Sequence, residues 1–219
     1  MSKSSPTKFE VKPPTTVPGA TSSDRKADYE IHPLFIQRWS PRAFTGEEIP
    51  DAELFSALEA ARWAPSGSNA QPWRFVFSKR DSSSWPVFLD LLNPGNRRWA
   101  ERASALILFV SKKTVSRNGE VVQSKSHSFD TGAAWQNFAL QALLLGWHTH
   151  GMGGFDREKA RTDLKVPDDF TIEAVIAIGR QGDKSALPAE LQEREFPNSR
   201  QPLKDLALEG GFSPMERGR

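Results

Sequence analysis

Two arginines and a serine lie within five residues in the segment Arg38-Trp39-Ser40-Pro41-Arg42. A guanidinium presents a planar pair of N–H donors that matches phosphate oxygens, and each charge-assisted bond contributes about 1.5–3 kcal/mol. The segment therefore predicts an anion site that could hold a phosphate. The alternative is a solvated turn, because paired arginines are common on protein surfaces.

A second candidate segment, residues 64–73, has the sequence Ala-Pro-Ser-Gly-Ser-Asn-Ala-Gln-Pro-Trp. Its small residues, amides and two prolines predict a rigid loop with many backbone donors, which a flat ligand could approach closely. The same composition is typical of a structural connection between a helix and a strand. The segment alone therefore leaves both interpretations open.

A third segment, Gly151-Met152-Gly153-Gly154-Phe155, is rich in glycine. Backbone N–H groups of glycine can face a ligand because no Cβ stands in the way. The spacing matches neither the dinucleotide-binding fingerprint nor a phosphate loop that ends in Gly-Lys-Ser/Thr. The cluster therefore does not identify a ligand by itself.

The composition limits the chemistry open to these segments. The chain has 219 residues and no cysteine, which excludes disulfides, thiolate nucleophiles, thiolate zinc sites and cysteine-ligated iron–sulfur clusters. Any redox chemistry must come from an organic cofactor. The charges are interspersed, with 29 Lys and Arg against 27 Asp and Glu, and a net charge of +2 is too small for dominant nucleic-acid binding.

The hydrophobic pattern predicts a cytoplasmic protein with no membrane helix. Its longest central apolar run, residues 105–110, is far shorter than the roughly 20 residues that span a bilayer. Residues 1–28 are rich in Ser, Thr, Pro and Lys and resemble no secretory signal. We expect them to form a disordered arm, because they bury too little to offset the ordering entropy, and we expect one domain over residues 29–219.

Helices and strands alternate along this domain without an internal repeat, which predicts a mixed α+β layer structure. Residues 115–128 are polar and predict an irregular loop or lid. A wide apolar surface on 130–145 predicts a helix buried on more than one side. The expected helices are 51–64, 83–92, 97–103 and 130–145, the expected strands are 73–78, 105–111 and 172–179, and a Pro-rich tail follows from 187.

Taken in this order, the segments resemble the nitroreductase family of FMN-dependent oxidoreductases. The matching residues are 38–44, the Ala-Pro-Ser…Asn…Gln-Pro-Trp run at 64–73, the segment 136–146, the segment 153–155, and Arg200. The resemblance covers about residues 30–208. It implies an α+β fold with a mixed or antiparallel sheet flanked by helices. It also implies an intertwined homodimer with two FMN sites at the subunit interface.

The same resemblance implies a set of FMN-binding residues. Arg38, Ser40 and Arg42 would hold the phosphate, the ribityl chain and the pyrimidine edge, and Arg200 would close on the phosphate. The remaining implied contacts are Pro65, Ser66 and Gly67 from the partner subunit, Asn69 and Gln71 in the same loop, Asn96 at the pyrimidine, and Met152, Gly153 and Gly154 near flavin N5 and O4.

The implied activity is that of an enzyme in which NAD(P)H reduces FMN and a nitroaromatic, quinone-like or related conjugated acceptor then takes the electrons. No protein nucleophile is required, since the flavin is the reactive group. A flavin-dependent dehalogenase, a flavin-degrading relative and a non-catalytic flavin-binding protein are the alternatives. The chain departs from the family pattern at Trp39, where a second basic residue is frequent, and at Gly153, where some relatives have an acid.

Two further sets of residues have both a functional and a structural interpretation. Trp99, His127 and Phe129 could line the substrate face and stack on a flat acceptor, or they could be packing residues. His148 and His150 share one side of a possible strand, as a pair of metal ligands would. No acidic residue lies at ligand spacing, which favours a structural pair with satisfied hydrogen bonds and no metal.

Overall fold

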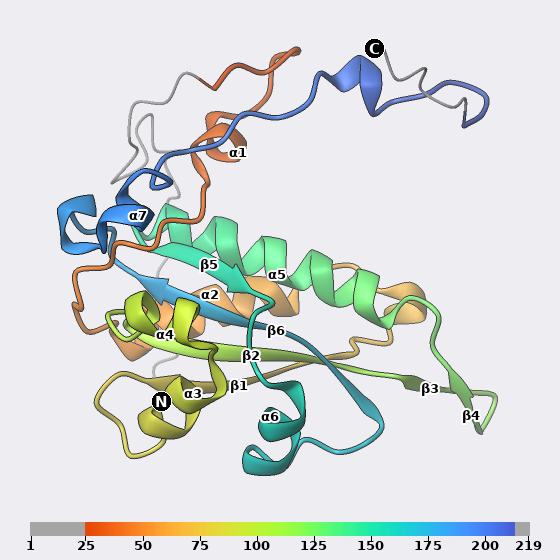
Figure 1. The fold of residues 1–219 in the computed structure, drawn as a ribbon. Helices are drawn as coiled ribbons and strands as arrows, with labels where there is room; N and C mark the ends of the chain where they lie inside the picture. Colours follow the sequence, from red (N-terminus) through yellow and green to blue (C-terminus); the bar gives the residue numbers. More distant parts are fainter. Residues whose placement is uncertain (1–24, 213–219) are drawn as a thin grey trace, which may run out of the picture.

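The computed structural model describes residues 25–212 of the chain. Its centre is a four-stranded sheet in the order β1-β2-β6-β5, in which all neighbouring strands run antiparallel (Figure 1). The strands are β1 (Trp73–Lys79), β2 (Ala105–Lys112), β5 (His148–Met152) and β6 (Phe170–Gly179). The expected antiparallel α+β fold is confirmed, and β5 is the possible strand that carries His148 and His150.

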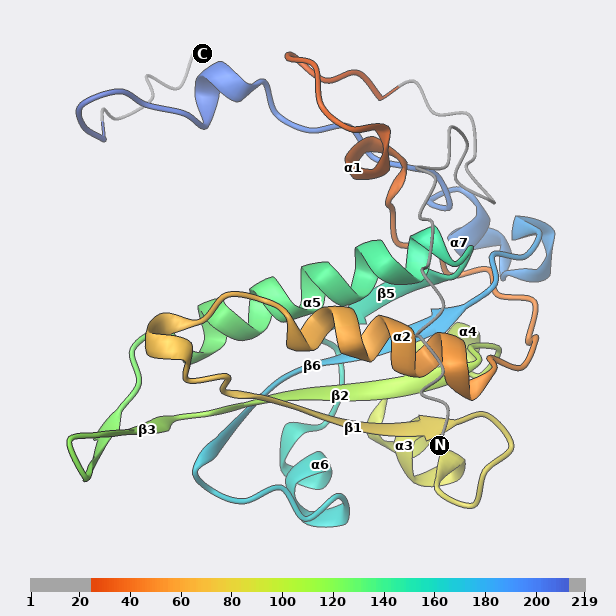
Figure 2. The ribbon, with the colours of Figure 1, turned by 180° about the vertical axis from the view of Figure 1, so that it is seen from behind.

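Strand β2 lies at the middle of two hydrophobic layers because its side chains alternate between both faces of the sheet. Ala105, Ile107 and Phe109 pack into the cluster that contains α2 (Asp51–Arg62) and α5 (His127–Leu144). The intervening residues Leu106, Leu108 and Val110 pack into the opposite cluster, together with α3 (Trp85–Leu91), α4 (Pro94–Ala100) and α6 (Arg157–Asp163). Figure 2 shows α2 and α5 side by side on one face of the sheet.

Helix α2 begins where the sequence predicts and ends two residues earlier than expected. Asp51 and Glu53 lie in its first turn, where acidic side chains complement the helix dipole. Its apolar stripe of Leu54, Leu58 and Ala61 is buried. Phe55 instead is half exposed and packs edge-on against Phe77 at a ring distance of 5.7 Å, so this ring belongs to a surface groove.

Residues 115–128 form a hairpin and a helix start, which corrects the prediction of an irregular loop. Strands β3 (Thr114–Arg117) and β4 (Glu120–Gln123) pair antiparallel beyond the end of β2. Asn118 and Gly119 adopt positive φ values of 52° and 85° at the turn, the conformation that Asn-Gly favours in two-residue hairpins. The Asn-Gly pair was therefore a readable signal that the polar composition obscured.

Helix α4 begins at Pro94, earlier than the predicted start at residue 97, and ends before the predicted end. The side chain of Asn93 accepts a hydrogen bond from the Asn96 N–H and caps the helix, and Pro94 occupies the first helical position. These are standard start signals for a helix, so the earlier start has a local cause. Helix α5 likewise begins at His127 rather than at residue 130.

The two ends of the described chain leave the body of the sheet on the same side and run near one another (Figure 1). The N-terminal end carries α1 (Pro33–Gln37), and the tail carries α7 (Ala189–Gln192) and two short 3₁₀ helices, Lys184–Ala186 and Leu203–Asp205. Residues 1–24 of the expected arm lie outside the described residues. Residues 25–28 make contacts, because the Asp28 carboxylate accepts the Leu203 N–H at 2.7 Å.

Within residues 25–212, no helix combines the length and the apolar character that crossing a bilayer requires.

Candidate functional site

The arginine segment 38–42 is an extended strap held against strand β5. The Trp39 ring is buried, and the His150 ring donates from Nδ1 to the Pro41 carbonyl at 3.0 Å. Above these anchors, the Arg38 guanidinium donates from Nη1 to the Ser40 hydroxyl at 3.2 Å. The strap is therefore fixed on its β5 side, and the Arg38 and Ser40 side chains contact each other.

Arg25 joins three separate stretches of chain at this strap. Its guanidinium donates from Nη1 to the carbonyls of Ile36 at 2.8 Å and Arg38 at 2.9 Å. Its Nε donates to the Asn198 carbonyl at 2.7 Å, two residues before Arg200 in the tail. Arg25 was not a predicted site residue, because nothing in a polar N-terminal segment indicates which distant carbonyls it will reach.

Three guanidiniums gather around this junction without a matching acid. Burial lowers the pKa of Arg38, and the neighbouring charges of Arg200 and then Arg25 lower it further. The pKa of Arg25 is lowered for the same reasons, by burial and by Arg200. No carboxylate in the described part of the chain forms an ion pair with any of the three. Like charges held together in this way favour the binding of an anion.

Arg42 differs from the other arginines because its charge is already compensated. Glu195 lies 3.6 Å from the Arg42 guanidinium and accepts the backbone N–H groups of Arg42 and Ala43 at 2.6 and 2.8 Å. The Glu195 side chain is almost fully buried. Sequence reasoning missed Glu195, which lies in the tail 152 residues from Ala43. Arg42 therefore contributes more to fixing the strap than to the unmatched positive charge.

His148 and His150 lie on β5 beneath the strap, and the structure separates their roles. The pKa of each is lowered to about 4, mainly by burial and further by nearby arginines, so both rings are neutral at pH 7. His150 packs against Trp99 at 4.6 Å and bonds Pro41. Both ring nitrogens of His148 are buried and have no hydrogen-bond partner among residues 25–212. The predicted satisfied pair therefore holds for His150 and is wrong for His148.

Within residues 25–212, no group of three or more His, Asp or Glu side chains is placed to hold a metal ion.

The glycine segment begins within the last two residues of β5 and borders a cavity of about 300 Å³. Phe109, Trp135 and Ile176 supply apolar lining, and Gly153, Ser128 and Glu173 also line it. A Cβ at Gly153 would meet nothing within 4 Å, so the backbone there is open to a ligand. At Gly154 a Cβ would collide with the side-chain amides of Asn93 and Asn96. The two glycines thus differ, because Gly153 has open space beside it and Gly154 is closely packed.

Asn96 lies beside the glycine segment, as the prediction requires, but its amide is engaged within the chain. Its Nδ2 donates to the Gly154 carbonyl at 2.9 Å, and the Asn93 backbone N–H donates to the same oxygen at 3.2 Å. Helix α4 therefore holds the segment Met152–Gly154 in place. Asn93 was missed by sequence reasoning, although its position before Pro94 is a readable capping signal.

The loop 65–72 lies at the start of helix α5. Its residues Ser68, Asn69 and Gln71 have positive φ values of 53°, 54° and 47°, which places an uncommon strain on the backbone. The Gly67 N–H donates to the buried Asp130 carboxylate at 3.1 Å. The Ser126 hydroxyl donates to the same oxygen at 3.0 Å. Asp130 therefore fastens Gly67, and with it the adjoining Pro65 and Ser66, to α5.

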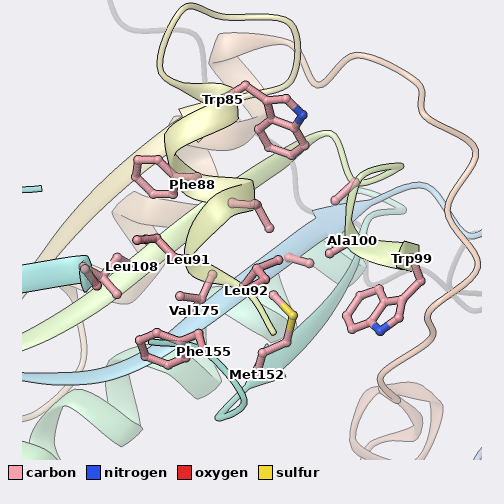
Figure 3. Close-up of a cluster of buried hydrophobic side chains, with 14 of the residues drawn as sticks. Trp85, Phe88, Leu91, Leu92, Trp99, Ala100, Leu108, Met152, Phe155 and Val175 are labelled. Atoms are coloured by element: carbon pink, nitrogen blue, oxygen red, sulfur yellow. The ribbon is translucent and has the colours of Figure 1, made fainter. Parts of the chain in front are cut away.

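The three residues expected on the substrate face have different positions. Trp99 is 2% exposed and lies in the core near Ala100 and Met152, which corrects its placement on that face (Figure 3). His127 is mostly buried, and its Nδ1 lies 2.7 Å from the Ser111 hydroxyl. Phe129 is 83% exposed in the first turn of α5, next to the cavity residue Ser128. Phe129 and His127 therefore remain candidates.

Comparisons with known proteins identify relatives of this chain. A sequence model of the Nitroreductase family matches residues 36–84 and 78–180. A solved oxidoreductase containing FMN is 50% identical, with a TM-score of 0.85, and the similarity covers 88% of this chain and 98% of that one. The NADH dehydrogenase of Thermus thermophilus is 26% identical over 211 residues, covering 79% of this chain and 92% of that protein.

The fold itself recurs at lower identity. A nitroreductase family protein from Streptococcus pneumoniae is 20% identical with a TM-score of 0.64, and the similarity covers 80% of this chain and 98% of that one. The matched family region includes the arginine strap, the loop 65–72, Asn96 and the glycine segment. The chain therefore belongs to the nitroreductase family.

Proposed function

We propose that the protein is an FMN-dependent oxidoreductase that uses NAD(P)H to reduce nitroaromatic, quinone-like or related conjugated acceptors. The observation that carries the proposal is the cluster of Arg25, Arg38 and Arg200. It gathers positive charge, and no carboxylate of the described residues forms an ion pair with it. A phosphate monoester carries about −1.5 to −2 charges at pH 7 and complements such a cluster. A solved relative that is 50% identical contains FMN.

In this assignment the phosphate is bound by Arg38, Arg200 and Ser40, with Arg25 beside them. Arg42 supports the strap through Glu195 and contacts the ribityl chain or the pyrimidine edge. Two properties of the strap favour this arrangement. The Ser40 hydroxyl already orients Arg38, and Trp39 is buried, so the strap exposes only its polar side chains.

The isoalloxazine ring is assigned to the glycine segment at the end of β5. Backbone N–H groups of Met152, Gly153 and Gly154 would bond its N5 and O4 edge, and the open space at Gly153 permits that approach. Asn96 holds the segment through the Gly154 carbonyl and borders the pyrimidine edge. When bound, FMN supplies the hydride chemistry, accepting two electrons from NAD(P)H and delivering them to an acceptor in a separate half-reaction.

The chain's own residues bind and orient the reactants in this scheme, and none is required as a nucleophile. The arginine cluster anchors one end of the cofactor, the glycine backbone fixes the other, and the apolar cavity excludes water beside the reacting edge. His127 and Phe129 at the start of α5 are assigned to the acceptor side.

We also propose that the functional form is a homodimer, in which Pro65, Ser66, Gly67, Asn69 and Gln71 approach the partner's flavin. The strained loop is rigidly held through Gly67, yet most of its side chains are exposed. Both described ends of the chain extend from the sheet (Figure 1). They carry exposed apolar side chains that a second copy would cover, among them Tyr29, Phe35, Phe196, Leu206 and Phe212.

The test is a titration of purified protein with FMN, followed by anaerobic addition of NADH or NADPH and then of a nitroaromatic. We expect one FMN per chain, bleaching of the flavin spectrum by a nicotinamide, its recovery on addition of the acceptor, and a dimer mass by light scattering. Flavin that binds but does not bleach would favour a non-catalytic flavin-binding protein. Failure to bind FMN would contradict the proposal.

A further inference from the structure

Glu173 on β6 is the centre of a polar cluster at the cavity. Its Oε1 accepts hydrogen bonds from the hydroxyls of Ser111 at 2.5 Å and Ser128 at 2.7 Å. The Ser111 hydroxyl also lies 2.7 Å from His127 Nδ1. These residues come from three elements, β2, β6 and the first turn of α5, so the cluster exists only in the folded chain.

The Glu173 carboxylate lacks a strong counter-charge. Its side chain is three-quarters buried, and no Lys or Arg in the described residues pairs with it. The Arg157 guanidinium bonds the backbone carbonyls of Gly153 and Glu173 and forms no ion pair with the carboxylate. The contact with His127 is long, at 3.9 Å. A partly buried carboxylate without an ion pair costs free energy and is more frequent at functional sites than in structural cores.

One oxygen of this carboxylate remains available to a ligand. Both serine hydroxyls bond Oε1, and within residues 25–212 no group donates a hydrogen bond to Oε2. Glu173 lines the cavity together with Gly153, Trp135 and Phe109. The cavity therefore combines apolar and aromatic lining with one carboxylate oxygen that no group among residues 25–212 bonds.

We propose that Glu173 is a specificity-determining residue that favours ring acceptors bearing a hydrogen-bond donor, such as a carboxamide, hydroxyl or amino group. Oε2 would accept the donor while the ring lies against Trp135 and Phe109. An acceptor without a donor leaves the desolvated carboxylate unpaired, so it binds less tightly. The selection rests on the proposed function, since it concerns the acceptor that this chain would reduce.

A matched pair of nitroaromatics tests the selection. The carboxamide of 4-nitrobenzamide and the acetyl group of 4-nitroacetophenone have nearly the same shape, but only the carboxamide has N–H donors. We expect the ratio of kcat/KM for the amide to that for the ketone to fall about tenfold in Glu173→Leu, because a charge-assisted hydrogen bond is lost. Glu173→Gln keeps a neutral acceptor and should fall between Glu173→Leu and wild type.

Glu120→Gln on the hairpin is the control, because this exposed carboxylate lies on β4 away from the cavity lining. Its ratio should equal that of the wild type. If Glu173 serves only to fasten Ser111 and Ser128, the variants will lower both kcat/KM values equally and the ratio will stay constant. That result would overturn the proposal.

A binding measurement without turnover uses the wild-type protein alone, so it does not depend on the folding of any variant. Calorimetric titration of the FMN-loaded wild-type protein with benzamide and with acetophenone should give tighter binding of benzamide by about tenfold. Equal affinities, or no binding of either ring, would overturn the selection even if FMN binds and bleaches normally. Absence of FMN binding would instead contradict the proposed function, so the two failures are distinguishable.

Discussion

The two ends of strand β5 border regions of opposite character. At its start, His148 and His150 lie beneath a strap where Arg38 meets Arg25 and Arg200 without an acid. At its end, Gly153 opens onto an apolar cavity that holds the Glu173 carboxylate without a strong counter-charge. A chain with a net charge of only +2 thus carries two local imbalances of opposite sign. The difference supports the proposed ligand, because a cationic strap complements an anionic phosphate and an aromatic lining complements a flat ring.

Different contacts stabilise the uncompensated charge at each end of β5. At the cationic end, backbone carbonyls of Ile36, Arg38 and Asn198 solvate the Arg25 guanidinium. At the cavity end, serine hydroxyls solvate one oxygen of Glu173. Neutral dipoles hold each group in place without cancelling its charge. Each charge therefore remains available to a ligand, which a salt bridge would have prevented.

Acid should perturb the cationic end most strongly. The pKa values of His148 and His150 are lowered to about 4, so each ring binds a proton less readily in the folded chain than in the unfolded one, where the value is near 6.5. Their contribution to the free energy of unfolding is complete above pH 6.5, decreases as the pH falls and is lost near pH 4. The difference between the folded and unfolded pKa values corresponds to about 3 kcal/mol of unfolding free energy per ring. Urea unfolding between pH 7 and pH 4 measures it.

The variant His148→Leu separates this titration from that of other groups. It removes one titrating ring, and no hydrogen bond within residues 25–212 is lost because neither nitrogen of His148 has a partner there. We expect stability at pH 7 at least equal to that of the wild type, with a weaker dependence on acid. His150→Leu should be destabilised at pH 7, since it loses the bond to Pro41. An unchanged acid dependence in His148→Leu would contradict the assignment.

Removing the Arg38 guanidinium should weaken phosphate binding at the cationic end of β5. We expect Arg38→Leu to weaken FMN binding by about 10- to 100-fold, since one charge-assisted contact to phosphate contributes about 1.5–3 kcal/mol. Riboflavin, which lacks the phosphate, should bind equally to both proteins. Quenching of flavin fluorescence measures the two dissociation constants. Equal losses for FMN and riboflavin would place Arg38 away from the phosphate.

At the cavity end, the two adjacent glycines should differ in how much substitution by alanine lowers stability. Gly154→Ala should lower the free energy of unfolding by about 1–3 kcal/mol, because its Cβ would collide with the amides of Asn93 and Asn96. Gly153→Ala has open space and should change stability by no more than about 0.5 kcal/mol. Denaturant unfolding without added flavin gives both values. Equal changes in the free energy of unfolding would show that the side chains around Gly154 move aside without a free-energy cost.

The smallest expected effect belongs to Arg25. Arg25→Gln keeps an N–H donor for one backbone carbonyl but loses the charge and the other hydrogen bonds of the guanidinium, and FMN affinity should fall by about tenfold or less. The loss should be greater at low ionic strength, because the charge acts partly through solvent. FMN titrations at 20 and 300 mM salt would test this. An FMN affinity that does not change with salt in either protein would exclude a direct electrostatic role for Arg25.

Much of the fold was predictable from local sequence signals. Helix α2 and strands β1, β2 and β6 agree with their predicted positions because periodicity and proline placement act over a few residues. The candidate segments 38–42, 64–73 and 151–155 were found for the same reason, since their composition is unusual over a short window. The misread hairpin at Asn118-Gly119 shows that a local signal was present and was outweighed by polar composition.

The sequence by itself determined which segments of this chain resemble a flavin site. It also determined that redox chemistry in a chain without cysteine requires an organic cofactor. Only the tertiary structure decided how charge is distributed among them. Glu195 neutralises Arg42 across more than 150 residues, Arg25 meets Arg38 and the tail, and Glu173 meets two serines from other elements. Such pairings depend on chain topology, and the Coulomb energy between two groups follows their distance in space rather than their separation in sequence.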